Sequence, residues 1–342
     1  MPFRSLTLQG PYRFLFPTSK DDLLLNPERH KYSLSTLMDM HAGSPLTHLE
    51  IPGYTAWSIP QATLQHLVHL GIRQASNLDK VTVFFENCVR LESLWISSEG
   101  DPSQTSVLLT ALAANPEAFR HLTHLKLALA APPDDDDGGT AAINELQKLT
   151  PFLLSKKKLR CLDWSEPWGS IEFMRPLLGS LSSLPQLEVL GLDLTCDHDD
   201  AAEMLKSGML NQYIPKSLTA LRLWVDYFDG RAPISNSLNT LLTGLTQLAF
   251  LWLDDYIRDP LAEPLTLAQS ASSLQLLCHR DDFYEVLRTD AGVTLEPPWS
   301  FTKAVFPSVD DLGCADRYWL MNGHWEVIRD QLRRRGDTGG ED

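Results

Sequence analysis

The sequence predicts an α/β solenoid, in which short parallel strands stack side by side and a helix returns the chain from each strand to the next. A six-residue motif with Leu or another apolar residue at positions one, four and six recurs along most of the 342 residues. Five clear copies are separated by 28, 31, 30 and 26 residues, and they begin at Leu159, Leu187, Leu218, Leu248 and Leu274. Such a unit holds one strand and one helix but cannot bury both apolar faces alone, so neighbours must stack.

The full set of motifs defines the expected domain organisation. Copies begin at residues 3, 46, 67, 91, 122, 159, 187, 218, 248 and 274. We expect about 9–10 irregular repeats over residues 1–280, with an insertion at about 10–31 and an acidic loop at 131–139. The copy at residue 67 has a second interpretation, as the end of a helix that starts near Pro60. Helices between motifs are expected at about 106–119, 141–154, 171–184 and 235–245.

The last 62 residues, 281–342, depart from the motif pattern. A terminal repeat needs a cap because its core would otherwise face water. The sequence therefore predicts a cap over 281–335 that ends in a closing helix from about residue 318, and a disordered tail over 336–342. Within the cap, we expect a helix at 281–288 and an extended stretch at 297–307.

The motifs resemble the leucine-rich-repeat superfamily over about residues 3–280, and the long units resemble its ribonuclease-inhibitor-like branch. That resemblance implies an arc with a parallel sheet on the concave face and helices on the convex face. The degenerate repeats and the Trp- and Arg-bearing tail resemble the leucine-rich region of fungal F-box-type proteins, which implies substrate recognition in a ubiquitin ligase. An F-box is a helical segment ahead of the repeats. Here the first motif begins at Phe3, so the resemblance is to a recognition region without an F-box.

Positions three, five and seven of each motif are expected on the concave face, because side chains alternate along a strand and the leucines face the core. Several of these positions hold Trp or Arg, which frequently anchor protein interfaces. The predicted binding surface consists of His48, Glu50, Trp95, His124, Lys126, Asp163, Arg222, Trp224, Phe250, Trp252 and Asp254. The alternative is that an insertion or the C-terminal tail folds over these side chains, which would make the chain a structural scaffold.

Acidic residues gather directly after the motifs. In a stacked fold these loops lie along one edge, where their charges add into a negative rim that speeds encounter with a basic protein surface. The predicted rim consists of Asp101, Asp134, Asp135, Asp136, Asp137, Asp197, Asp199, Asp200, Asp226, Asp229 and Asp255. The alternative is a charge pattern that serves only solubility.

Charge and cysteine usage restrict the class of protein. With 44 acidic against 29 basic residues, the formal net charge is −15, which argues against nucleic acid or an anionic membrane as partner. The five cysteines are widely spaced without a C-x-x-C pair, as expected for reduced thiols in the cytoplasm or nucleus. No signal peptide or transmembrane run is recognisable, so we expect a protein that is not secreted.

No catalytic motif or cofactor-binding loop is recognisable, and we expect a non-enzymatic protein without a metal or cofactor. The alternative is an enzyme or metal-dependent protein that uses Asp134–Asp137 or the pair Cys196 and His198. The aspartates lie between Pro-Pro and Gly-Gly, which is typical of a solvated loop. The Cys–His pair lacks the second pair of ligands that a zinc site needs. The oligomeric state is left open by the sequence.

Overall fold

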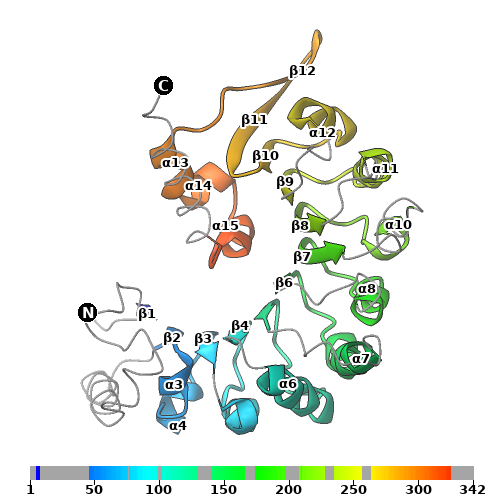
Figure 1. The fold of residues 1–342 in the computed structure, drawn as a ribbon. Coiled ribbons are helices and arrows are strands. Elements are labelled where there is room, and N and C mark those ends of the chain that lie inside the picture. Colours follow the sequence, from blue (N-terminus) through cyan, green and yellow to red (C-terminus); the bar gives the residue numbers. More distant parts are fainter. Residues whose placement is uncertain are drawn as a thin grey trace, which may run out of the picture. The chain divides into compact units, whose positions relative to one another are not determined.

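The structure is a computed structural model that divides into two compact units, residues 1–159 (unit 1) and 160–342 (unit 2). We describe each unit by itself. The described residues are 5–7, 46–75, 77–98, 102–129, 140–165, 174–196, 208, 210–227, 235–255 and 263–324. In both units the strands run side by side and the repeat helices lie together on one side of them (Figure 1).

Unit 1 contains five parallel strands among its described residues, each paired with the next along the chain. They are β1 (Ser5–Thr7), β2 (His48–Pro52), β3 (His69–Ala75), β4 (Ser93–Ser98) and β5 (His124–Ala128). The connections contain α3 (Gly53–Ala56), α4 (Gln61–Leu64), the 3-10 turn η1 (Leu78–Lys80), α5 (Thr82–Asn87) and α6 (Pro102–Ala114), and α7 (Thr140–Ser155) follows β5. The two long helices, α6 and α7, pack against each other.

Unit 2 continues the same alternation and ends differently. Its parallel strands are β6 (Cys161–Ser165), β7 (Val189–Cys196), β8 (Ala220–Tyr227), β9 (Phe250–Asp255) and β10 (Leu276–His279). The antiparallel strands β11 (Asp282–Thr289) and β12 (Gly292–Leu295) follow. The repeat helices are α8 (Arg175–Leu181), α10 (Leu210–Tyr213), α11 (Ser235–Gly244) and α12 (Pro264–Ser270), and the C-terminal helices are α13 (Phe301–Val305), α14 (Val309–Leu312) and α15 (Ala315–Met321).

The motif explains both the core and the register of the strands. Leu187, Leu190 and Leu192 occupy its apolar positions and are fully buried, and burying each such side chain contributes about 1.5–3 kcal/mol. The carbonyl at position two accepts hydrogen bonds from the amides at positions two and three of the next repeat. For example, Glu188 O accepts from the amides of Thr219 and Ala220 at 2.7 and 3.2 Å. This contact recurs from repeat to repeat, so equivalent motif positions form straight rows across each sheet.

The predicted fold class is confirmed: each of the ten motifs supplies one parallel strand, from β1 to β10. The motif at residue 67 forms β3 rather than a helix end. The helices expected at 106–119, 141–154, 171–184 and 235–245 correspond to α6, α7, α8 and α11. The expected insertion at 10–31, the loop at 131–139 and the tail at 336–342 lie outside the described residues.

The C-terminal region requires three corrections. Residues 281–288 were expected to be helical, but they form strand β11, because the positive φ angles of Arg280 and Asp281 turn the chain back along β10. The extended stretch expected at 297–307 contains α13, which begins where the Ser300 hydroxyl accepts from the Lys303 amide. The closing helix was expected from about residue 318 to 335; α15 begins earlier, at Ala315, and ends at Met321, and residues 325–335 lie outside the described residues.

Candidate functional site

The face of each sheet opposite the repeat helices carries motif positions three, five and seven, and we call it the ladder face. Rows of equivalent positions cross it because the strands are in register. In unit 1 the position-three row is polar, and it consists of His48, His69, Ser93 and His124. In unit 2 the same row is apolar, and it consists of Cys161, Val189, Ala220, Phe250 and Leu276. The two units therefore present chemically different ladder faces.

The apolar row of unit 2 is covered by the C-terminal helices. Val189, Phe250 and the rest of the row form one buried cluster with Ala304 of α13, Leu312 of α14, and Leu320 and Met321 of α15. Trp299 and Trp319 pack against the edge of this cluster. The C-terminal helices are thus the intramolecular occupant of the unit 2 ladder face.

A buried ion-pair cluster lies beneath this cover. Arg222 Nη2 donates to Asp163 Oδ1 at 2.9 Å, and Arg222 Nη1 lies 2.6 Å from Asp193 Oδ1. The Arg222 side chain is 1% exposed and the Asp163 side chain 0%. Burial alone would lower the pKa of Arg222, but the two carboxylates outweigh it and hold this pKa above its ordinary value. The guanidinium therefore stays charged, as a buried pair of this kind requires.

Gly191 makes the Asp163–Arg222 pair possible. It lies between these two residues in the position-five row. A Cβ atom at Gly191 would lie 2.0 Å from Asp163 Oδ1 and 3.1 Å from Arg222 Nε. Only a residue without a side chain leaves room for Arg222 to reach across the intervening strand.

Polar contacts fix the C-terminal segment on the sheet. His324 Nε2 lies 3.0 Å from Asp163 Oδ2, and the His324 ring meets the Trp252 ring edge to face at 5.3 Å. At the start of α15, Asp316 Oδ2 accepts from Arg160 Nη2 at 2.8 Å. These contacts join α15 to β6, the first strand of unit 2.

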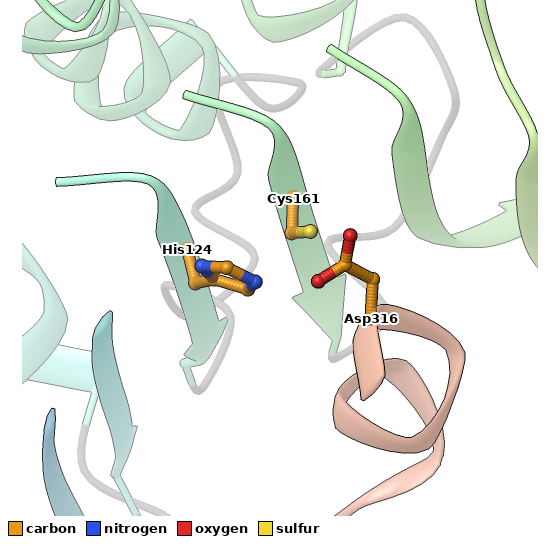
Figure 2. A group of neighbouring side chains, drawn as sticks. All are labelled: His124, Cys161 and Asp316. Atoms are coloured by element: carbon orange, nitrogen blue, oxygen red, sulfur yellow. The ribbon is translucent and has the colours of Figure 1, made fainter. Parts of the chain in front are cut away.

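Cys161 and Asp316 also face each other in unit 2, with Sγ and a carboxylate oxygen within 4.8 Å (Figure 2). The third side chain in that view, His124, belongs to β5 of unit 1. Burial, and then the Asp316 carboxylate, raise the pKa of the Cys161 thiol above its ordinary value. The thiol is therefore protonated at neutral pH, which does not suit a nucleophile.

The ladder face of unit 1 has a different chemistry. In the position-three row, the rings of His48 and His69 stack with centroids 5.9 Å apart, and His69 Nδ1 lies 2.8 Å from Ser93 Oγ. His48 is exposed, whereas His69, Ser93 and His124 are partly buried. Three imidazoles and a hydroxyl therefore line one row.

The next rows of unit 1 combine ion pairs with an aromatic ring. Glu50 pairs with Arg73 at 2.9 Å and with His69 at 3.3 Å. Burial would raise the pKa of Glu50, but the hydrogen bond from His69 and the charge of Arg73 outweigh it and lower this pKa. The Arg73 guanidinium lies over the Trp95 ring at 4.3 Å, and the Lys126 ammonium lies 5.7 Å from that ring. Trp95 and Lys126 are 7% and 2% exposed.

The structure places the predicted binding residues in two groups. His48, Glu50, Trp95, His124 and Lys126 share the ladder face of unit 1. The unit 2 group is largely buried, as the alternative interpretation expected: Asp163, Arg222, Phe250, Trp252 and Asp254 are at most 4% exposed, and Trp224 is partly buried. Trp95 is also buried, so the expectation of exposed Trp side chains is wrong for Trp95 and Trp252.

His69 and Arg73 belong to the unit 1 face but were not among the predicted residues. Their signal was present, because they occupy positions three and seven of the motif that begins at Leu67. Most of the predicted acidic rim lies outside the described residues: Asp101, Asp134, Asp135, Asp136, Asp137, Asp197, Asp199, Asp200 and Asp229. Asp226 is the last but one residue of β8, and Asp255 is the last residue of β9. Of the alternative metal ligands, only Cys196, the last residue of β7, falls in the described part.

Comparison with known proteins returned no matching family model and no matching curated protein. Among solved structures, the chain is similar to the leucine-rich-repeat-containing protein LegL7 from Legionella pneumophila, with 14% identity and a TM-score of 0.35, over 69% of this chain and 84% of that one. A protein from Bacteroides fragilis matches with 14% identity and a TM-score of 0.35, over 64% of this chain and 66% of that one. Within the described residues, no helix has the length and apolar character needed to cross a membrane. The fold assignment itself is based on the strands and helices of this chain.

Proposed function

We propose that the chain is a non-catalytic protein-interaction module that binds its partner on the ladder face of unit 1. The observation that carries this proposal is the difference between the two position-three rows. The row of unit 2 is apolar and is buried under the chain's own C-terminal helices. The row of unit 1 is polar and includes the exposed His48, which suits contact with a separate molecule better than a permanent core.

The composition of the unit 1 face also supports a protein partner. Arg and Trp are enriched among residues that dominate binding energies, and Arg73 stacked on Trp95 supplies a rigid combination of both. Ion pairs to Glu50 hold Arg73 and His69 in place. A surface whose side chains are already ordered loses less conformational entropy when it binds.

The state of the buried thiols agrees with a non-catalytic role. Burial raises the pKa of Cys88 to about 12, and it raises the pKa of Cys161 and Cys278 above the ordinary value. A reactive cysteine needs the opposite shift. Of the alternative enzymatic clusters, Asp134–Asp137 and His198 lie outside the described residues, so that alternative stays untested.

Finer parts of the proposal concern the partner and its setting. The acidic rim would favour a partner with a basic surface, and the resemblance to fungal F-box-type proteins suggests substrate recognition in a ubiquitin ligase. Free cysteines, of which Cys88, Cys161 and Cys278 are buried and Cys314 is exposed, suit the cytoplasm or nucleus. A second candidate function, a scaffold with no ladder-face ligand, is favoured by the covered face of unit 2, where Arg222 and Trp252 are inaccessible.

Affinity purification from the native cell tests this proposal, with His48→Asp as the face variant and His66→Asp as its control. Both histidines are exposed, but His66 lies in the turn before β3 rather than on the ladder face. A partner bound by the wild type and the control, but retained at least about ten-fold less by His48→Asp, supports the proposal. Equal retention by all three would contradict it. A ubiquitin-ligase adaptor among the retained proteins would support the finer assignment.

A further inference from the structure

We infer that β12, the last strand of the unit 2 sheet, pairs antiparallel with β12 of a second copy of the chain, in a register centred on Thr294. This inference goes beyond the proposed function, because it concerns the other unit and a different binding partner. It is carried by the unpaired edge of β12 and by the way the four residues of this strand complement themselves.

One edge of β12 carries main-chain groups without a partner. Glu296 N donates to Glu285 O on β11 at 2.9 Å. Because the residues of an antiparallel strand face their partner alternately, Thr294 also points its N–H and C=O groups at β11, whereas those of Val293 and Leu295 point away. Within the part of the chain that the structure describes, no hydrogen bond is found on that outer side of Val293 or Leu295. Each of the two residues therefore offers a free donor and a free acceptor.

The edge of β12 is also unprotected. Proteins commonly protect an exposed edge with Lys, with Pro or with a covering segment, but Val293, Thr294 and Leu295 include neither Lys nor Pro. Helix α12 packs against β12, and Arg288 Nη2 on β11 donates to Ala268 O of that helix at 2.8 Å. Since Arg288 is paired with Val293 and shares its face, α12 lies against a face of the hairpin and not along its edge. The tip of the hairpin projects past α12 (Figure 1).

The sequence of β12 is complementary to itself in one register. Two copies of the same edge can pair only in the antiparallel orientation. With Thr294 opposite Thr294 of the second copy, Val293 lies opposite Leu295, and each copy donates two hydrogen bonds and accepts two. A pair of threonines directly opposite each other is a favourable cross-strand pair. The flanking Glu296 then lies opposite the uncharged Gly292.

The two neighbouring registers are less favourable. A shift that places Val293 opposite itself brings Asp290 opposite Glu296, and like charges directly opposite each other destabilise a sheet. A shift that places Leu295 opposite itself brings Pro297 opposite Val293, where proline has no N–H to donate. Only the register described above avoids both penalties. This self-complementarity assigns the edge to a second copy of the chain and not to an unrelated strand.

The charge of the chain and the small contact limit the strength of this pairing. The formal net charge of −15 on each copy opposes association, but at about 0.15 M salt charges more than about 8 Å apart are largely screened. Stable interfaces involve about 20–30 residues a side, whereas β12 has four. We therefore expect a reversible dimer with a dissociation constant on the order of 100 µM. Such a dimer carries two unit 1 ladder faces, so a molecule with two binding sites would be held more tightly than by one face.

Sedimentation velocity of the full chain tests the inference, over concentrations of about 5–300 µM that bracket the expected dissociation constant. The test variants are Thr294→Lys and Thr294→Glu, each measured alone and in an equimolar mixture. Thr294 is exposed, so neither change should disturb the fold. The matched controls are Thr302→Lys and Thr302→Glu, at an exposed threonine of α13. These controls account for the change in overall charge.

Each Thr294 variant alone should dimerise at least about five-fold more weakly than the wild type, because two like charges then lie directly opposite each other. In the mixture a lysine meets a glutamate, and association should be at least about five-fold tighter than for either variant alone. The Thr302 variants should behave as the wild type, alone and mixed. A wild type that stays monomeric up to about 300 µM, Thr294 variants that dimerise as the wild type does, or a mixture that associates no more tightly than its components would overturn the inference. Equal weakening by the Thr302 variants would overturn it as well.

Discussion

Replacing Gly191 with alanine is expected to destabilise unit 2, although the backbone there suits any residue. In the native sheet, the new Cβ atom would lie 2.0 Å from Asp163 Oδ1 and 2.8 Å from Asp163 Cγ. Asp163 cannot move aside easily, because Arg222 and His324 hold its two oxygens and the side chain is fully buried. The alanine variant must therefore break or distort the Asp163–Arg222 pair.

The magnitude follows from two opposing effects. Breaking a buried ion pair costs about 3–5 kcal/mol, because one charge is left without its partner in the interior. Replacing glycine with alanine returns about 0.4–1 kcal/mol by restricting the unfolded chain. The net loss in the free energy of unfolding is therefore about 2–4.6 kcal/mol.

Urea unfolding followed by tryptophan fluorescence measures this loss, with Gly179→Ala as control. Gly179 lies on α8 with open space at its Cβ position, so alanine there should stabilise by about 1 kcal/mol. A second measurement places Gly191→Ala in an Asp163→Ala background, where the atom that the new Cβ would strike is gone. The cost should fall below about 1 kcal/mol there. An equal cost in both backgrounds, or a loss under about 1 kcal/mol in the wild type, would refute the assignment of the clash to Asp163.

Two further outcomes are expected. The pKa of Glu50 is lowered in the folded state, so the stability that Glu50 contributes is present above its ordinary pKa of 4.5 and is lost as the pH falls through the folded value. The melting temperature of Glu50→Gln should therefore fall less steeply than that of the wild type on acidification below about pH 4.5. His324→Asn removes the ring that meets Trp252 and disturbs the contact with Asp163, and hydrogen exchange should rise in α15 while that of β3 and β4 stays unchanged.

The leucine spacing was sufficient to predict the fold because it determines both which side chains face the core and how long the chain is between two strands. Apolar positions four and six, as in Leu190 and Leu192, place two side chains on the same face of a strand, and the apolar residue at position one closes the preceding turn. The length between motifs admits one helix and little else. Strand order, direction and core residues follow from these constraints, and all of them are local in the sequence.

The C-terminal region could not be predicted in the same way because its contacts are not local. Asp163 and His324 are 161 residues apart, and no periodicity links them. The residues of β11 are compatible with a helix or a strand when considered alone, and the choice depends on pairing with β10. The Asp163–Arg222 pair likewise requires the register of three strands and the absence of a side chain at Gly191.

The candidate site could be predicted from the sequence only in part. Its rows could be aligned from the motifs alone, and the alignment separates polar position-three residues before Leu159 from apolar ones after it. Interface propensity gave Trp and Arg equal weight in both units. It could not show that Trp95 and Trp252 are both buried, Trp252 against the docked C-terminal segment at His324, because propensity describes the side chain and not what covers it.

Position three of the motif therefore determines what the ladder face can do, while positions one, four and six determine that the sheet forms. Exposing an apolar row such as Val189, Ala220 and Phe250 to water is unfavourable, so the row requires a permanent cover. The chain supplies this cover with its own C-terminal helices. Burying that row also buries the charges beside it, which persist only because Arg222 and Asp163 neutralise each other. A polar row such as His48 and His69 has no such requirement and can exchange water for a partner at little cost. The same repeat thus yields a closed, apolar position-three row in unit 2 and a polar one in unit 1, and the difference is one residue per strand.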